Sequence, residues 1–318
     1  MLRLILCFGA LSMTPAAYAQ TMADPDFDTS VESPAFAEGE GPLVLIDAGH
    51  NNWHTGSGRY APAADVLRND GYRVSAHRGK FTAESLEEAG VVIVVSAIED
   101  GIARAMADGI DAEEVASWPL PVESAFSSRE IDVLVDWVGG GGALLLIVDY
   151  MPLAGMSAKL AAGFGVHIAN GYAYDAAGEN HVTFTRSAGT LRGHAVTDGH
   201  GPDERIDRVQ TFAGTTLLVP YGAEPLLLFD RSAYVVLPEA ISPGDTPPPA
   251  DAPRHSIAGW SQGAVMDVGD GRFAVFGEHA MFSAQRFPEG GVTGMNVPSA
   301  SQNKQFLLNV VRWLAGVL

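Results

Sequence analysis

Residues 43–54 have the sequence LVLIDAGHNNWH, and this stretch decides the fold. It opens with four apolar residues after a Gly-Pro break, a pattern that predicts a buried strand. The strand ends in a group of polar side chains, namely Asp47, His50, Asn51, Asn52 and His54. Open α/β sheets bind their ligands at the carboxyl ends of parallel strands. The stretch therefore predicts a central strand and one side of a functional site.

Downstream, the chain alternates between helical and strand patterns. Residues 91–95 are a continuous run of valine and isoleucine, which is typical of a strand buried on both faces. Ser127 and Glu130 form a capping box, and apolar residues follow it at helical spacing. This alternation predicts a mostly parallel sheet with helices on both faces. The predicted helices cover residues 59–70, 82–89, 127–138 and 155–165, and the next predicted strands cover residues 72–76, 91–95 and 143–148.

The pattern changes in the second half of the chain. Between residue 166 and about residue 260, short strand-like segments lie between turns, which predicts a β-rich insertion. A hairpin is predicted for 261–268 and 272–276 around a Gly-Asp-Gly turn, and an amphipathic helix for 303–314. Residues 98–122 are rich in Asp and Glu and predict a solvated, partly helical excursion over the rim of the sheet.

The first 41 residues predict a signal and a leader rather than folded structure. A short positive start, an apolar run over 4–13 and the tripeptide Ala17-Tyr18-Ala19 are typical of a secretory signal peptide, here residues 1–19. We therefore expect an exported protein, periplasmic or secreted, that begins at Gln20. Residues 20–41 are acidic and contain prolines, which predicts a flexible leader before a single domain over 42–318.

Composition excludes several classes of function. The chain has 318 residues, is 47% hydrophobic and carries a formal net charge of −19, which disfavours nucleic acid or an anionic membrane as partner. Cys7 is the only cysteine, and it lies within the predicted signal peptide. The mature protein is thus expected to have no disulfide and no thiolate nucleophile. No stretch reaches about 20 continuous apolar residues, so we expect no membrane span.

Four segments resemble a family of often exported bacterial proteins: DAGHNNWHT with RYAP, AFSSREIDVLVDWVGGGGALLLIVDYMP, GRFAVFGEHAMFSAQ and NKQFLLNVVRWL. This family is placed in the class I glutamine amidotransferase-like superfamily. Its relatives include the trehalose-utilisation protein ThuA and domains of intraflagellar-transport and gliding-motility proteins. The resemblance covers roughly residues 43–318. It implies a flavodoxin-like fold and no settled activity.

The departure from the superfamily's enzymes concerns the nucleophile. In true amidotransferases a cysteine occupies a sharp turn after a central strand, and a later His and Glu complete a triad. The matching turn here is expected at residues 148–152, where Asp149 takes the place of the cysteine. The resemblance therefore implies that the chain is not a glutamine amidotransferase.

One hypothesis for the site is metal-assisted hydrolysis. His50, His54, Asp149 and Glu278 stand at or just after predicted strand ends and are ligand types that zinc accepts. A bound divalent metal such as zinc would lower the pKa of a water molecule to about 7 and so supply a nucleophile without cysteine.

A second hypothesis uses no metal. Asp149 acts as nucleophile or general base, His50 or His279 is its acid/base partner, and Ser96 is a positioning hydroxyl. If Asp149 and Glu278 lie close together, their charges raise the pKa of one of them and prepare an acid/base pair.

A third hypothesis is not catalytic: the polar groups hold loops together or bind a ligand without turning it over. The candidate ligand-binding residues, suited to a sugar or a similar polar ligand, are Asp47, Asn51, Asn52, Trp53, Tyr60 and Tyr150. We favour an exported small-molecule- or carbohydrate-related protein, a hydrolase if it is an enzyme. The alternative is a non-catalytic ligand-binding or protein-interaction module of the cell envelope.

Overall fold

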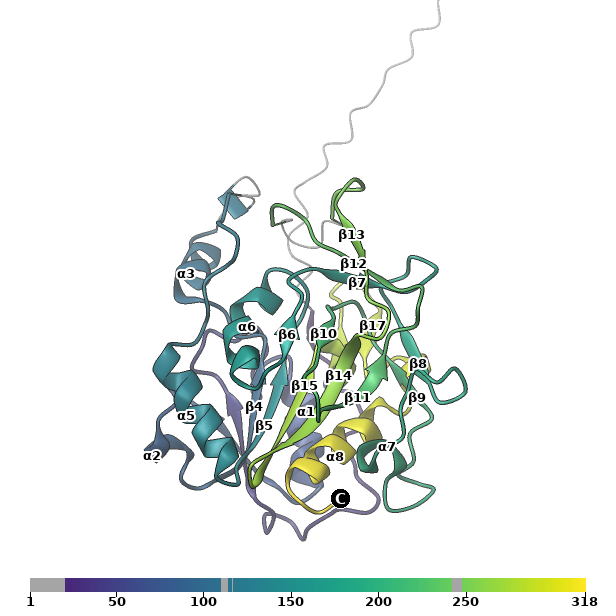
Figure 1. The fold of residues 1–318 in the computed structure, drawn as a ribbon. Coiled ribbons are helices and arrows are strands. Elements are labelled where there is room, and N and C mark those ends of the chain that lie inside the picture. The colour runs from purple at the N-terminus through teal and green to yellow at the C-terminus, as the bar shows by residue number, and fades with distance from the viewer. Residues whose placement is uncertain (1–20, 110–113, 116, 242–247) are drawn as a thin grey trace, which may run out of the picture.

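The computed structural model describes residues 21–109, 114–115, 117–241 and 248–318 (Figure 1). The predicted signal peptide, residues 1–19, lies outside the described residues, as does part of the acidic excursion over 98–122. Within the described ranges, every helix is too short or too polar to cross a bilayer.

A central sheet organises the molecule, and in the described part of the chain it has nine strands. Its parallel part has the order β3-β2-β4-β5-β15, and the central strands β4 and β5 are buried along most of their length. The buried runs of valine, leucine and isoleucine explain this position, because both faces of a parallel sheet are covered. These parallel strands are β3 (Arg73–His77), β2 (Leu43–Asp47), β4 (Ala89–Val95), β5 (Ala143–Ile147) and β15 (Gly271–Phe276).

Two apolar cores separate the sheet from its helices. Alternate residues of one strand enter different cores: Val44 and Ile46 belong to one, and Leu45 belongs to the other. The first core contains α1 (Ala61–Asn69) and α8 (Asn303–Leu314). The second contains α2 (Ala83–Leu86), α5 (Ser128–Gly139) and α6 (Leu153–Gly163). The predicted doubly covered α/β sheet is therefore confirmed.

Local sequence signals explain how α5 begins and what packs on its end. Ser127 and Glu130 make both hydrogen bonds of the predicted capping box. The predicted hairpin forms between β14 (Ser261–Val268) and β15, in antiparallel register. A β-carbon added at Gly271 would lie 2.0 Å from the carbonyl oxygen of Val138, so only glycine lets this turn pack against the end of α5.

The β-rich insertion extends the central sheet and also forms small sheets of its own. Strands β10 and β11 both pair with β14, and β6 pairs with β10. Outside the central sheet, β12 lies between β7 and β13, and β8 pairs with β9. The bounds are β6 His167–Ile168, β7 Tyr172–Tyr174, β8 Thr183–Thr185, α7 Ala195–Asp198, β9 Arg208–Gln210, β10 Leu217–Leu218, β11 Glu224–Leu228, β12 Tyr234–Val236 and β13 Arg254–Ser256.

The segment predicted to be a flexible leader is not detached from the domain. Its strand β1 (Met22–Ala23) pairs with β16 (Ala284–Arg286), which also pairs with β17 (Val292–Gly294). The backbone carbonyls of Asp28 and Ser30 accept hydrogen bonds from Lys304. The acidic composition of residues 20–41 predicted a flexible leader. The structure instead holds this segment against the domain through β1 and through hydrogen bonds from Lys304 of α8 to its backbone.

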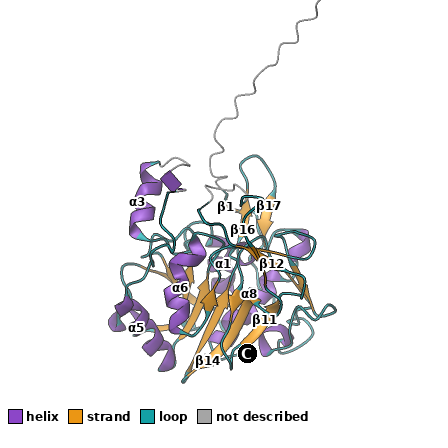
Figure 2. Cartoon of the chain, turned by 45° about the horizontal axis from the view of Figure 1, so that its top comes forward, coloured by secondary structure: helices purple, strands orange, loops and turns teal. Residues whose placement is uncertain are grey.

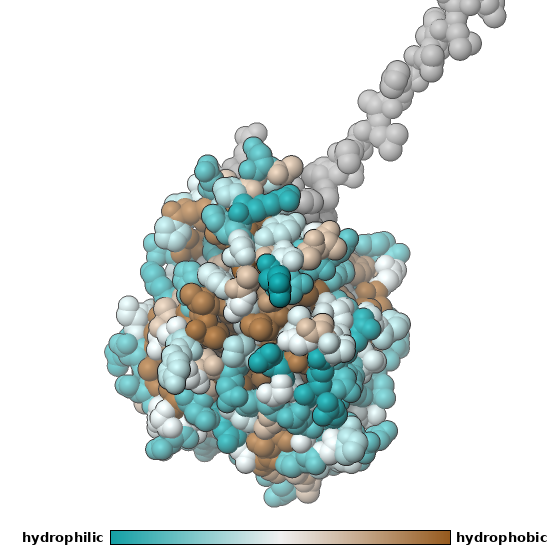
Figure 3. All heavy atoms as spheres, turned by 45° about the vertical axis from the view of Figure 1, so that its right-hand side comes forward, coloured by the Kyte–Doolittle hydropathy of each residue, from teal (hydrophilic) through white to brown (hydrophobic). Residues whose placement is uncertain are grey.

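Helix α3 (Asp100–Asp108) lies in the described part of the acidic excursion. Glu99 caps its first turn, and none of its residues is buried. In both Figure 1 and Figure 2 it stands at the edge of the molecule, away from α5 and α8. The surface turned toward the reader in Figure 3 is mainly hydrophilic, with smaller groups of hydrophobic atoms.

Candidate functional site

A cavity of about 860 Å³ lies at the carboxyl ends of the parallel strands. Its wall includes His54 after β2, Ile98 after β4, Asp149 after β5 and His279 after β15. The volume lies within the range of small-molecule sites. The cavity is thus at the edge where the topology brings the strand ends together.

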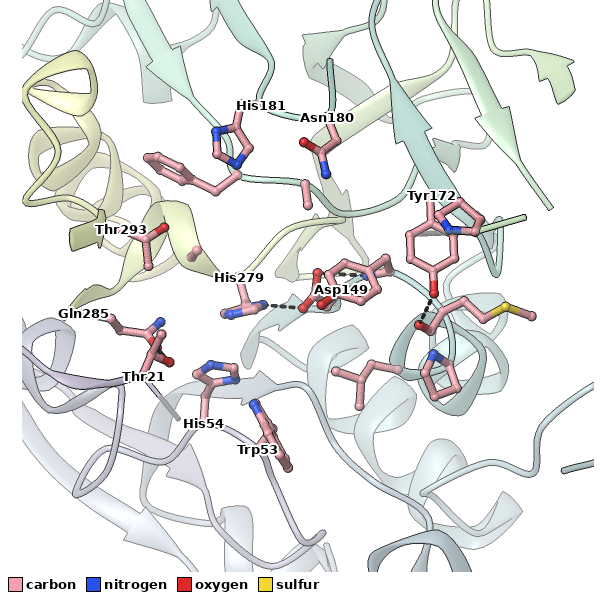
Figure 4. Close-up of a pocket in the computed structure, with 18 of the residues that line it drawn as sticks. Thr21, Trp53, His54, Asp149, Tyr172, Asn180, His181, His279, Gln285 and Thr293 are labelled. Carbon is pink, nitrogen blue, oxygen red and sulfur yellow. Dashed lines mark hydrogen bonds and ion pairs between the residues drawn. The ribbon is translucent and has the colours of Figure 1, made fainter. Parts of the chain in front are cut away.

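Asp149 and His279 form an ion pair in the wall of this cavity. The Oδ2 atom of Asp149 lies 2.7 Å from Nδ1 of His279 (Figure 4). The other carboxylate oxygen of Asp149 accepts a hydrogen bond from the Tyr150 amide. Burial lowers the pKa of His279, but the charge of Asp149 and its hydrogen bond outweigh this effect and raise the pKa above the usual 6.5. The pair therefore has the composition of an acid/base dyad.

Two aromatic residues contact His279, one at its imidazole ring and one at its backbone carbonyl. The ring of His54 lies 3.9 Å from it, centroid to centroid, and Figure 4 shows the two rings side by side. Burial and the neighbouring His279 and Arg59 charges hold the pKa of His54 well below 6.5, so His54 is neutral. The Tyr60 hydroxyl donates a 2.5 Å hydrogen bond to the His279 carbonyl. Tyr60 therefore lies behind the cavity wall, where it holds the backbone of His279, and does not contact a ligand in the cavity.

Glu278 also lies behind the wall. It is fully buried, and its two carboxylate oxygens accept hydrogen bonds from the Ala280 and Met281 amides. Burial, together with the charge of Asp149, raises its pKa to about 7 although the charge of His279 opposes the shift. Glu278 therefore shapes the turn η1 (Ala280–Phe282) that follows β15.

Distant segments complete the wall. Figure 4 shows Asn180 and His181 of the β-rich insertion pointing into the cavity from one side, and Gln285 and Thr21 lying on another. The Thr21 hydroxyl donates to the Gln285 side-chain oxygen over 2.5 Å. The sequence did not predict these four residues, because no local pattern marks them and they meet only in the folded chain.

Trp53 and Tyr150, two of the candidate ligand-binding residues, line the cavity. The Arg59 guanidinium lies 4.7 Å from the Trp53 ring centroid and donates to the carbonyl of Thr21. Arg59 therefore fixes both an aromatic wall residue and the start of the ordered leader.

His50 belongs to a different, fully buried cluster. Its Nδ1 atom lies 2.9 Å from Asp47 Oδ2, and its Nε2 atom lies 2.8 Å from Glu130 Oε1. The Asn52 side chain also donates to Asp47. The sequence placed Asp47, His50 and Asn52 at the ligand site. In the structure they form a buried hydrogen-bonded cluster behind the sheet edge and do not line the cavity. Glu130 was predicted only as a cap; its reach to His50, 80 residues away, is a tertiary contact.

Asn51 and Ser96 also lie apart from the dyad. Asn51 donates to Asp100 at the start of α3, and neither residue lines the cavity. Ser96 follows β4 with a φ of 44°, whereas Asp149 has no such left-handed backbone. The left-handed backbone therefore occurs at Ser96 and not at Asp149, and the buried Ser96 hydroxyl has no hydrogen-bond partner among the described residues.

The predicted metal set of His50, His54, Asp149 and Glu278 is not assembled. Both ring nitrogens of His50 are engaged with Asp47 and Glu130, away from the cavity wall. Among the residues that the structure describes, no three His, Cys, Asp or Glu side chains are grouped so as to hold a metal ion.

The fold and the site together define a class: an α/β domain with a mostly parallel, flavodoxin-like sheet, whose strand-end cavity carries an Asp–His pair and, among the described residues, no cysteine. No family model matches the sequence, and no curated protein matches it either.

Several solved structures are similar to this chain at low sequence identity. The mmIFT52 N-terminal domain is 16% identical with a TM-score of 0.54, over 86% of this chain and 96% of that domain. A ThuA-like protein from Bacteroides uniformis is 11% identical with a TM-score of 0.41, over 89% and 93% of the two chains. A protein described as a GMP synthase component from Thermoplasma acidophilum is 8% identical with a TM-score of 0.41, over 87% and 94%. The similarity to the mmIFT52 N-terminal domain concerns the fold alone, and the mostly parallel sheet of this chain, with helices on both faces, has the flavodoxin-like arrangement.

Proposed function

We propose that the protein is a hydrolase of a small molecule or carbohydrate derivative, in which Asp149 and His279 activate a water molecule. The 2.7 Å ion pair between these side chains in the wall of a ligand-sized cavity is the observation that carries the proposal. The aromatic and amide side chains around it are suited to a polar organic ligand.

The proposed chemistry follows from the orientation of the imidazole. The carboxylate of Asp149, 2.7 Å from Nδ1, favours the tautomer of neutral His279 with its proton on Nδ1, and Nε2 then accepts a proton from water. The hydroxide so formed adds to the carbonyl carbon of an ester. The alcohol then leaves with the proton that His279 has taken, so water and ester become acid and alcohol. Asp149 remains ionised and stabilises the transient imidazolium.

Asp149→Asn and His279→Gln are each expected to lower the rate of hydrolysis by at least about a hundredfold, because each removes part of the proton-transfer unit. The assay is nitrophenolate release from a panel of nitrophenyl esters and nitrophenyl glycosides. Asp132→Asn, on the exposed face of α5, is the matched control and should keep full activity. Hydrolysis that survives in both dyad variants, or a wild type that is inactive on the whole panel, would favour the non-catalytic binding or interaction module.

The pH profile gives a second readout of the same proposal. The base form of His279 is needed, and its pKa lies above 6.5. Activity should therefore rise with pH through a value above 6.5 and fall on acidification. A rate independent of pH in that region would argue against His279 as the base.

We further propose that the protein is exported. The support is the sequence alone: the positive start, the apolar run over 4–13 and Ala17-Tyr18-Ala19. Mass spectrometry of the protein recovered from the periplasm or medium is expected to find an N-terminus at Gln20. A cytoplasmic chain that retains residue 1 would contradict this proposal.

A further inference from the structure

The cavity has two chemically different ends. Around the dyad its wall carries polar side chains, with His54, Gln285 and Thr293 beside Asp149 and His279, together with apolar ones such as Phe287 and Val292. The other part of the same wall is an apolar arm, which we define as Ile98, Ile102, Met106, Val115, Leu153 and Met156. The arm is formed mainly by α3, the segment that follows it and the start of α6.

The arm leaves apolar surface uncovered. None of the α3 residues is buried, and yet Ile102 and Met106 face the cavity and lie only partly buried against the core. Water against such a surface is unfavourable, and binding of an apolar group would remove it. The arm is thus suited to a hydrophobic substituent, whereas a fully polar ligand would leave it exposed.

The charges at the polar end restrict the other half of the ligand. No Lys or Arg occurs among the described residues that line the cavity, and the one carboxylate there, Asp149, is paired with His279. An anionic head group would lose its hydration in a wall without Lys or Arg, where the charge of His279 is already paired with Asp149. A cationic head group would compete with His279 for Asp149. The polar end therefore favours an uncharged, hydrogen-bonding head.

We propose that the cavity takes an amphipathic substrate: an uncharged, hydroxyl-rich head beside Asp149 and His279, and an apolar tail along the arm between α3 and α6. An acylated or alkylated sugar has this chemistry. The inference rests on the proposed function only for the position of the head group.

The test is calorimetric titration of the purified protein with hexyl glucoside, methyl glucoside, hexyl phosphate and hexyltrimethylammonium, all below their micelle concentrations. Hexyl glucoside is expected to bind at least about tenfold more tightly than methyl glucoside, because the added methylene groups are buried in the arm. Both charged hexyl compounds are expected to bind more weakly than hexyl glucoside. Equal affinity for the two glucosides, or tighter binding of either charged compound, would overturn the inference.

The substitution Met106→Glu tests whether the apolar tail binds along the arm. This substitution is expected to lower the affinity for hexyl glucoside about tenfold and to leave the affinity for methyl glucoside unchanged. The substitution should be tolerated because α3 has no buried residue, and thermal unfolding checks this. Leu218→Glu, at a half-exposed leucine outside the cavity wall, is the matched control. Unchanged binding of hexyl glucoside to Met106→Glu would place the tail elsewhere and overturn the proposal.

The titration also separates this inference from the proposed function. It is repeated with Asp149→Asn, which cannot turn over a substrate under the proposed mechanism. Preference for hexyl over methyl glucoside, in a protein whose wild type hydrolyses nothing in the nitrophenyl panel, would support the ligand class and overturn only the hydrolase proposal. Hydrolysis of the panel by a protein that binds both glucosides equally would support the hydrolase proposal and overturn the proposed ligand class.

Discussion

Replacing Arg312 by alanine is expected to lower the free energy of unfolding by about 3–5 kcal/mol, the usual effect of breaking a buried ion pair on one side. Arg312 Nε donates to Asp70 over 2.9 Å, and Nη2 donates to the other oxygen of the same carboxylate over 2.5 Å. Asp70 is fully buried and Arg312 is 4% exposed. Without the guanidinium, the Asp70 carboxylate would keep its burial and lose its cation.

The same guanidinium joins segments that are far apart in sequence. It donates to Glu204 before β9 and to the carbonyl of Ser33 in the ordered leader. The measurement is chemical denaturation of wild type and Arg312→Ala. The control is Arg68→Ala, which removes a pair with Asp65 whose side chains are about half exposed, and it should cost about 1 kcal/mol at most. Equal effects of the two substitutions would mean that the Arg312 pair is not desolvated in solution.

Replacing His50 by alanine is expected to destabilise the fold by a similar amount, about 3–5 kcal/mol, because two buried carboxylates would lose a shared partner. Asp47 is fully buried and Glu130 is 3% exposed. The imidazole also stacks on Phe81 at 5.0 Å between ring centroids. Both of its nitrogens face carboxylate oxygens, which only accept hydrogen bonds, so both must carry protons.

The pH dependence of stability follows from this arrangement. Burial lowers the pKa of His50, but hydrogen bonds to Asp47 and Glu130 and their charges outweigh it and raise the pKa above 6.5. A raised folded-state pKa means that the stabilisation is fully present below 6.5 and is lost as the pH rises through the folded-state value. Burial raises the pKa of Asp47, but His50, together with His77 and Asn52, outweighs this effect and lowers it to about 2, so Asp47 loses its contribution only as the pH falls toward that value.

Urea denaturation on both sides of the folded-state pKa of His50 tests this prediction. Wild type should lose stability on the alkaline side, and His50→Ala should lack that decrease. His255→Ala, at an exposed residue of β13, should leave both the stability and its pH dependence unchanged. A His50→Ala protein as stable as wild type at every pH would show that the imidazole is neutral and dispensable.

Much of the fold could be predicted because its signals are local. The capping box at Ser127 and Glu130 and the hairpin around residues 269–271 depend on residues a few positions apart, and both are observed. The strand predicted at 72–76 is found one residue later, at Arg73–His77. Such elements follow from periodicity and turn chemistry before any long-range contact forms.

The site was predictable only in outline. Parallel strands place their carboxyl ends at one edge, and this rule correctly brought Asp149, His279 and His54 to one cavity. It could not separate His50 from His54, which stand four residues apart in a turn without a regular period. The His50 ring lies in the core between two carboxylates, whereas the His54 ring lies in the cavity wall beside His279.

The sequence by itself determined the α/β class and the edge of the sheet at which the strand-end side chains gather. Tertiary structure alone decided which polar groups meet, where the backbone is strained and whether the acidic leader is ordered. The physical reason is the range of the interactions. Propensity and patterning act over a few residues, whereas ion pairs such as Arg312 with Asp70, 242 residues apart, exist only after the chain has folded.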